Sequence, residues 1–246
     1  MSADSASIKT ETVTYDAKGT QCKGYLALAG GTGPRPGVLV VHEWWGLDDY
    51  IRGRARMLAE LGYNALAVDM YGGGQTASDP QGAGALMNGV LGDVAAAEAR
   101  LAAARATLAA QAGTDASRIA AIGYCFGGAM VLHAARIGMD LRAVASFHGA
   151  LGSFHKPAPG SVKAKILVCH GGADALIPEA DIANFKQEMD AAGADYEFVS
   201  YDGALHGFSN PNATANGEKY GLPLRYDADV DKRSWAAMKA LFERAL

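Results

Sequence analysis

The chain has 246 residues, of which 50% are hydrophobic and 20% are charged, and its formal net charge is −4. This composition is typical of a globular protein with ample material for a large core, and α/β folds of this length are routinely single domains. The lack of a dense Lys or Arg run disfavours nucleic acid and membrane surfaces as partners. No apolar run approaches the roughly 18 residues of a membrane span, and residues 1–7 lack the pattern of a signal peptide.

The three cysteines, Cys22, Cys125 and Cys169, are odd in number and widely spaced, with no Cys-x-x-Cys pair. This pattern disfavours a disulfide framework or a zinc ribbon. We therefore expect a cytoplasmic protein, because a reducing compartment keeps a catalytic thiol usable. Cys169 ends a predicted buried strand and is expected to be inert, whereas the exposure of Cys22 does not follow from the sequence.

The first elements predicted are two short strands at residues 10–15 and 23–28, followed by a turn-rich connector at 30–37. Residues 38–41 form a continuous apolar run, as expected of a strand buried on both faces of a parallel sheet. Strands and helices then alternate. The further strands are predicted at 65–68, 119–122, 143–146, 166–169 and 196–200, and the helices at 48–61, 90–110, 125–135, 179–192 and 228–245. Residues 72–80 and 152–160 are predicted loops, and a long loop precedes the last helix.

Alternating strands and helices of this kind predict an α/β fold with a doubly wound, mostly parallel sheet and helices on both faces. We expect one domain over residues 1–246, with no large cap domain. Ligands bind such sheets at the carboxyl ends of the strands, so the loops at that edge are where a functional site is expected.

The segment Gly123-Tyr-Cys-Phe-Gly127, followed by Gly128, has the pattern Gly-x-nucleophile-x-Gly between a predicted strand and a predicted helix. This is the context of a nucleophile elbow, a sharp turn in which side chains at the glycine positions would collide with backbone. The turn would lift the Cys125 sulfur above the sheet, and the N-terminal end of the next helix would favour the thiolate. The amide of Phe126 would then stabilise an oxyanion. The alternative is a small buried cysteine in a glycine-rich turn.

Two more candidate residues follow later strands at the same edge of the predicted sheet. Asp174 follows the strand at 166–169, and His206 follows the strand at 196–200. Taken alone, Asp174 is typical of a turn, and His206 is as often an ordinary loop histidine as a catalyst. With Cys125 they give the chain order nucleophile, acid, histidine that α/β-hydrolases share. The order predicts that Asp174 orients His206 and that His206 serves the thiol.

Five segments spread along the chain carry a further signal. They are Val40-Val-His-Glu43-Trp-Trp-Gly46, Asp69-Met-Tyr71, Gly123-Tyr-Cys-Phe-Gly-Gly128, His170-Gly-Gly-Ala-Asp174 and His206-Gly-Phe208. With them the chain resembles the dienelactone hydrolase family over nearly its whole length. The resemblance implies an α/β-hydrolase fold, a triad of Cys125, Asp174 and His206, and hydrolysis of a small carboxylic ester or lactone through a thioester. The amide of Trp44 would be the second oxyanion donor.

By the same resemblance, Glu43 is the glutamate that contacts the resting thiol and is displaced by substrate, which frees the thiolate to attack. A carboxylate beside a thiol disfavours its ionisation, so the thiol would resist oxidation until substrate arrives. The alternative is that Glu43 pairs with an arginine such as Arg52 or Arg54.

The sequence departs from the founding enzyme of the family at two positions. That enzyme holds its anionic substrate with one arginine two residues after the Asp-x-Tyr motif and another four residues after the histidine. Gly73 and Asn210 occupy these positions here, and no Lys or Arg lies between Arg56 and Arg100. A carboxylate would lose two charge-assisted hydrogen bonds of about 1.5–3 kcal/mol each, so neutral substrates are favoured.

Aromatic residues near the predicted site suggest an apolar pocket. They are Trp44, Trp45, Tyr71, Phe126 and Phe208, although Phe126 and Trp45 could equally be core. Such a pocket favours neutral aryl esters. A polarisable thiolate within it would also attack neutral phosphotriesters with good leaving groups, as a promiscuous secondary activity.

We expect no cofactor and no metal. His42, Glu43, His170 and His206 could be imagined as a metal site, but none has the spacing of a helical His-x-x-x-His motif. His133, on the helix after the elbow, is expected to be structural. A monomer or a homodimer is expected. Two alternatives to a hydrolase are a non-catalytic binding protein, disfavoured by the intact triad, and a thiol redox sensor, disfavoured by the lack of a nearby resolving cysteine.

Overall fold

The computed structural model describes residues 7–246, and the chain divides into two compact units that meet between Ala120 and Ala121. Most of the segment on which the expectation of no signal peptide rests, residues 1–6, lies outside the described residues. The expectation of one domain stays a prediction, and each unit is described by itself.

The first unit begins with a β-hairpin. Strands β1 (Lys9–Ala17) and β2 (Thr20–Leu28) pair antiparallel, and β2 pairs antiparallel with β4 (Asn64–Val68). Strand β3 (Arg35–Val41) pairs with β4 in parallel. All of β4 and residues 37–41 of β3 are buried, which explains why these strands read as unbroken apolar runs.

Three helices belong to the first unit: α1 (Asp49–Glu60), α2 (Pro80–Leu91) and α3 (Val94–Ala109). The helix predicted over 90–110 corresponds to α3, which begins later than predicted, at Val94, and α2 was not predicted. The sequence obscured α2 because it carries three glycines, which weaken helix propensity. Capping explains why α2 forms, since Asp79 accepts a hydrogen bond from the Gly82 amide and Pro80 occupies the first turn.

Strands of the second unit are all parallel. Strand β5 (Thr114–Tyr124) starts in the first unit and ends in the second, where its last residues pair with β6 (Ala143–Phe147). Strand β6 pairs with β7 (Lys165–Gly171), and β7 pairs with β8 (Tyr196–Tyr201). Parallel pairing brings the carboxyl ends of the four strands to one edge, the edge at which the sequence predicts the site.

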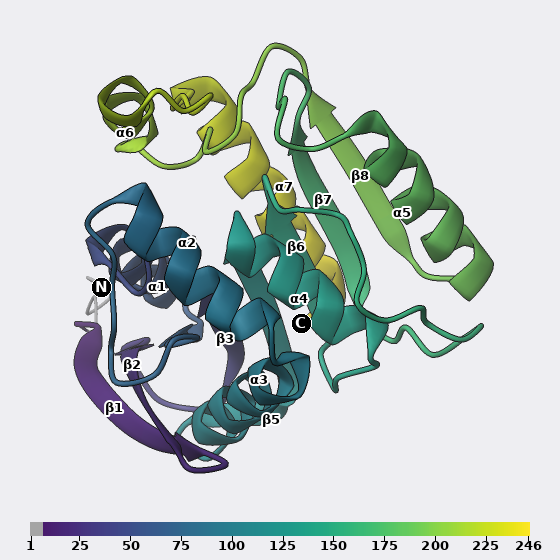
Figure 1. The fold of residues 1–246 in the computed structure, drawn as a ribbon. Coiled ribbons are helices and arrows are strands. Elements are labelled where there is room, and N and C mark those ends of the chain that lie inside the picture. The colour runs from purple at the N-terminus through teal and green to yellow at the C-terminus, as the bar shows by residue number, and fades with distance from the viewer. Residues whose placement is uncertain (1–6) are drawn as a thin grey trace. The chain divides into compact units, whose positions relative to one another are not determined.

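The helices of the second unit are α4 (Phe126–Arg136), α5 (Glu179–Ala192), α6 (Ala213–Tyr220) and α7 (Ala228–Ala245). The predicted bounds of α5 and α7 are confirmed, whereas α6 lies in a segment expected to be a loop. Figure 1 shows α4 in front of β6 and α7 behind it, so helices cover both faces of this part of the sheet. The predicted α/β class with a mostly parallel sheet is confirmed.

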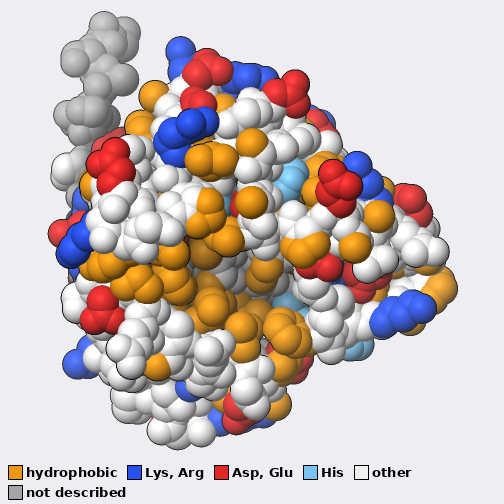
Figure 2. Space-filling view, turned by 45° about the horizontal axis from the view of Figure 1, so that its top comes forward, with side chains coloured by type: hydrophobic (Ala, Val, Ile, Leu, Met, Phe, Trp, Pro, Cys, Tyr) orange, Lys and Arg blue, Asp and Glu red, His pale blue; other side chains and the backbone are white. Residues whose placement is uncertain are grey.

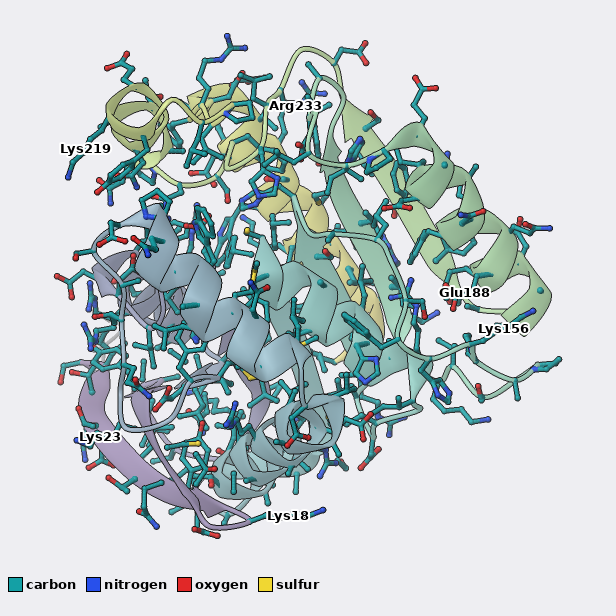
Figure 3. The ribbon with its side chains drawn as sticks, in the orientation of Figure 1. Lys18, Lys23, Lys156, Glu188, Lys219 and Arg233 are labelled. Carbon is teal, nitrogen blue, oxygen red and sulfur yellow. The ribbon has the colours of Figure 1, made fainter. Side chains whose placement is uncertain are left out.

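A buried ion pair fixes the segment that follows β6. Arg136 in α4 has 1% of its side chain exposed and donates to Glu188 at 3.0 Å and to the carbonyl of Leu151 at 2.8 Å. Glu188 lies on α5, where Figure 3 labels it. Burial lowers the pKa of Arg136, but the Glu188 carboxylate offsets part of this effect. The pair therefore ties the loop after β6 to two helices.

Charged side chains of both signs are interspersed on the face shown in Figure 2, with hydrophobic side chains gathered between them. Within residues 7–246, none of the helices is long and apolar enough to cross a membrane.

Candidate active site

Cys125 lies in a strained turn between β5 and α4, with φ 53° and ψ −116°. Such a conformation costs about 1–3 kcal/mol for a residue other than glycine and persists only where its surroundings impose it. A Cβ atom at Gly123 would overlap the carbonyl group of Gly127, so no other residue fits there. The amide of Cys125 donates to the carbonyl of Phe147 at 3.0 Å, which anchors the turn to β6. These features are those of a nucleophile elbow.

The start of α4 packs unusually close to the segment after β6. A Cβ atom at Gly128 would lie 2.8 Å from the Cα of Gly149, and a Cβ at Gly149 would lie 2.8 Å from the Cα of Gly128. Phe126 is the first residue of α4 and is 4% exposed. Its amide belongs to the first turn, where N–H groups point out of the helix and create a positive end beside Cys125.

Asp174 and His206 are joined by a hydrogen bond of 2.8 Å between Oδ2 and Nδ1. Asp174 has no exposed side-chain surface, and its other oxygen accepts from the Leu176 amide at 2.9 Å. The two loops that carry the pair touch through backbone, because Ala173 N donates to Ala204 O at 2.9 Å and a Cβ at Gly171 would lie 2.7 Å from that oxygen. Glycine at position 171 therefore permits the contact that sets the acid against the histidine.

His206 also forms a side-chain hydrogen bond with Cys125, so the three side chains form a continuous chain. Burial alone would lower the pKa of His206. Charge interactions with Cys125 and Asp174 and the hydrogen bonds to both outweigh burial and raise this pKa to about 10. Negative charge at either neighbour therefore favours the protonated form of His206.

The other two thiols lie in different environments. Cys22 in β2 and Cys169 in β7 have no exposed surface, and burial raises the pKa of Cys22 to about 11 and that of Cys169 to about 12. Cys125 is partly exposed. The expectation that Cys169 is inert is consistent with its burial.

Two histidines of the imagined metal site, His42 and His170, are buried. Burial lowers the pKa of His42 to about 4, and its Nε2 accepts a hydrogen bond from the Met70 amide at 3.2 Å. Burial likewise lowers the pKa of His170. In the part of the chain from residue 7 onward, no group of three or more His, Cys, Asp or Glu side chains is arranged to hold a metal ion.

In the first unit, Asp69 organises the loop that follows β4. Its buried carboxylate accepts four backbone N–H groups at 2.8–3.0 Å, those of Lys23, Tyr71, Gly72 and Gly74. The glycines at 72, 73 and 74 all have positive φ, with 66° at Gly73. A Cβ atom at Gly73 would meet nothing within 4 Å, so the position has space for a side chain. Its positive φ would nevertheless strain any residue other than glycine.

The loop after β3 carries the predicted glutamate and tryptophans. Glu43 is 5% exposed, and its carbonyl closes a turn by accepting the Gly46 amide at 3.2 Å. Tyr71 donates its hydroxyl to the carbonyl of Trp44 at 2.8 Å, which joins the loops after β3 and β4. The ring of Trp45 lies 5.0 Å from that of Trp44, and Trp45 is 8% exposed.

Phe208 and Asn210 belong to the second unit and are buried. Phe208 has no exposed surface, and Asn210 is 2% exposed with its Oδ1 accepting the Asn212 amide at 2.9 Å. Both hold the loop after His206. The second unit thus brings together Cys125, Asp174, His206 and Phe126, and the first gathers Glu43, Trp44, Trp45, Tyr71 and Gly73. The contact between Glu43 and the thiol, the Trp44 oxyanion donor and the pocket lining stay predictions.

Sequence reasoning assigned no role to Asp69 or His148. Asp69 stands between a buried strand and three consecutive glycines, and this pattern could have marked it as the residue that shapes the loop. His148 follows β6 directly, at the edge where ligands are expected, and it has φ 41° and no exposed surface. Nothing in the sequence indicates that conformation.

Comparisons with known proteins agree with the geometry. The chain is similar to an α/β-hydrolase enzyme from a Medee basin deep-sea metagenome library, with a TM-score of 0.65 at 18% identity over 95% of this chain and 97% of that one. A dienelactone hydrolase-like promiscuous phosphotriesterase from metagenomic libraries is 37% identical, with a TM-score of 0.88 over 97% and 98% of the two chains. A Yersinia pestis relative, provisionally named a carboxymethylenebutenolidase, is 30% identical over 80% of this chain and 77% of its own.

The fold is that of an α/β-hydrolase. The family match and the named relatives indicate a hydrolase that acts on ester or lactone bonds. The model of the Dienelactone hydrolase family matches residues 22–246, and the chain belongs to that family.

The exposure of the three cysteines leads to a prediction about thiol chemistry. One equivalent of iodoacetamide at neutral pH should alkylate Cys125 alone, because Cys22 and Cys169 are buried and hold their protons until the pH approaches about 11 and about 12. Peptide mass mapping of the labelled protein measures this selectivity. Labelling at Cys22 or Cys169 in the folded protein before Cys125 would contradict it.

Proposed function

We propose that the protein is a thiol hydrolase that cleaves carboxylic esters or lactones, with Cys125 as nucleophile, His206 as base and acid, and Asp174 as the group that orients His206. The observation that carries the proposal is the hydrogen-bonded chain from Cys125 through His206 to Asp174, which starts at a strained turn. Nucleophile, base and orienting carboxylate within hydrogen-bond reach are the signature of covalent catalysis.

Acylation begins when His206 takes the thiol proton and the Cys125 sulfur attacks the substrate carbonyl. The carbonyl electrons move to oxygen, which is stabilised by the Phe126 amide at the start of α4 and, on our proposal, by the Trp44 amide. The oxyanion collapses, the bond to the leaving oxygen breaks, and His206 returns its proton to an alcohol or to the opened lactone hydroxyl. The product of this half-reaction is a thioester on Cys125.

Deacylation requires a neutral His206, and the thioester provides it. Two of the contributions that raise the pKa of His206, the thiolate charge and the bond to Cys125, are lost when the sulfur is acylated. Burial, which lowers the pKa of His206, is then opposed only by the carboxylate of Asp174. A neutral imidazole can accept a proton from water, whose oxygen attacks the thioester and releases the acid and the thiol.

The triad proposal is tested by three substitutions measured on 4-nitrophenyl acetate. Cys125→Ala should abolish turnover, and His206→Ala should lower kcat by about 10²–10⁴-fold, the usual contribution of general-base catalysis. Asp174→Asn should cost less than His206→Ala. Cys22→Ala serves as the control that removes a thiol outside the site, and it should retain activity.

Near-normal turnover by Cys125→Ala would refute the triad and favour a different nucleophile. Absence of ester turnover in the wild type would favour a binding protein. Thiol oxidation without hydrolysis would favour a redox sensor.

We further propose that the enzyme prefers neutral aryl esters to substrates with a carboxylate beside the reacting carbonyl. The support is the absence of arginine at Gly73 and Asn210. Arg225 or another cation would have to take over the clamp, and Arg225 is exposed and donates to the carbonyl of Gly203 at 2.9 Å.

Neutral esters should therefore show a higher kcat/KM than matched anionic esters. Gly73→Arg should shift the ratio toward the anion by roughly tenfold or more, since one charge-assisted hydrogen bond is worth about 1.5–3 kcal/mol. Gly73→Gln is the matched control, because it imposes the same backbone strain at φ 66° without the charge. An equal shift in both variants would contradict the role of charge.

We also propose a secondary phosphotriesterase activity at the same thiol. The support is that a relative 37% identical to this chain is named a promiscuous phosphotriesterase, and that a neutral triester needs no arginine. The thiolate would attack phosphorus and expel an aryloxide, and water activated by His206 would then cleave the sulfur–phosphorus bond. A thiolate is a better leaving group than a serine alkoxide, so the intermediate should turn over.

Release of 4-nitrophenolate from paraoxon should therefore continue past one equivalent in the wild type and be absent in Cys125→Ala. The rate should be lower than that for the aryl ester. A burst of one equivalent with no further release would mean inhibition rather than turnover, and equal rates in the two proteins would place the chemistry elsewhere.

A further inference from the structure

His148 lies against His206, the histidine of the proposed triad. Its ring centroid lies 5.1 Å from that of His206, with the planes inclined at 63°, and 5.0 Å from that of Phe208 at 87°. Its Nε2 shares a hydrogen bond of 2.7 Å with the hydroxyl of Ser209, which is fully buried. One side chain therefore contacts three of the four residues from 206 to 209.

The backbone of His148 is fixed on both sides by the elements that build the site. Its amide donates to the carbonyl of Cys169 in β7 at 2.8 Å. The carbonyl of Phe147, the residue before it, accepts the amide of Cys125 at 3.0 Å. Gly149, the residue after it, lies against Gly128 of α4 without room for a side chain. The same short segment thus anchors the nucleophile turn and presents the ring to the histidine.

Its conformation is one that a non-glycine residue adopts only where the surroundings impose it. His148 has φ 41°, one of three positive values at non-glycine residues in residues 7–246, and another is that of Cys125. Strain of this kind concentrates where the position of a side chain matters for function. The strained backbone of His148 places its ring against the loop of His206, and the ring gives this loop a second support.

We propose that His148 is a positioning residue that keeps the His206 imidazole within hydrogen-bond reach of Cys125. This inference rests on the proposed triad. The bond from Asp174 holds one nitrogen of His206, but a single bond does not fix the tilt of a ring. The ring of His148 packs against that of His206, and its bond to Ser209 holds the loop that carries His206. A displacement of about 1 Å at a catalytic group can cost about 10²-fold in rate, so loss of the support should be visible in the chemical steps.

The experiment separates ring, hydrogen bond and backbone. His148→Ala removes ring and bond, His148→Phe keeps the ring, and Ser209→Ala removes only the bond. His148→Asn tolerates the positive φ but lacks the ring. His133→Ala is the matched control, because His133 is another buried histidine of the same unit, on α4, and its ring centroid lies 6.0 Å from that of Phe154. Each variant is assayed for thermal unfolding, for kcat and KM on 4-nitrophenyl acetate, and for the rate of Cys125 alkylation by iodoacetamide at pH 7.

His148→Ala and His148→Asn should lower kcat by about 10²-fold with KM nearly unchanged, because a misplaced base affects the transition state more than binding. The alkylation rate of Cys125 should fall with kcat. His148→Phe and Ser209→Ala should lie between these variants and the wild type. His133→Ala should change only the unfolding temperature.

Wild-type rates in His148→Asn would mean that only the backbone conformation matters, and lower stability with unchanged alkylation would mean that the residue is merely structural. Either result overturns the proposal. If His148→Ala does not fold, wild-type rates in both His148→Phe and Ser209→Ala would do the same. Turnover by Cys125→Ala would instead refute the triad, and the alkylation rates would still report the coupling of His148 to the thiol.

Discussion

The site depends on one steric constraint, the close approach of backbone to backbone around Cys125. The elbow can form only because Gly123 leaves space for the carbonyl group of Gly127, and α4 can reach β6 only because Gly128 and Gly149 meet without side chains. A Cβ at any of these positions would force the start of α4 outward. The sulfur would then lose both its place above the strands and the positive end of the helix.

A close backbone approach also places Asp174 beside His206. Gly171 allows the loop after β7 to touch the loop after β8, and the backbone bond from Ala173 to Ala204 fixes that contact. The backbone packing of the two loops therefore sets the hydrogen-bond distance between Asp174 and His206. In the first unit a side chain fixes the loop instead. The Asp69 carboxylate accepts hydrogen bonds from the amides of a loop whose three glycines have positive φ.

How far the sequence predicts this molecule depends on the range of the interactions involved. Apolar runs such as that of β4 and the pattern around Cys125 are local, so strands, elbow and the order of Cys125, Asp174 and His206 follow from the sequence. The glycine-rich helix α2 was not predicted from the sequence, because its caps and packing stabilise it and its helix propensity is low. The proposed role of His148 depends on contacts with residues about 60 positions away, such as Ser209, and nothing in the sequence indicates its backbone conformation.

Burial of the proposed triad would also link the proposed preference for neutral substrates to the chemistry. Asp174 has no exposed side-chain surface and His206 only 8%, so charges near them are weakly screened. In the proposed mechanism, a thiolate at Cys125 would hold His206 as an imidazolium, and acylation would remove that charge and free the base. An anionic substrate would leave its own charge beside His206 after acylation and would keep the imidazolium protonated. An arginine clamp would neutralise that charge, but glycine and asparagine occupy its positions here. On this proposal, neutral substrates would suit both halves of the reaction, since only they would allow His206 to lose its proton when water must be activated.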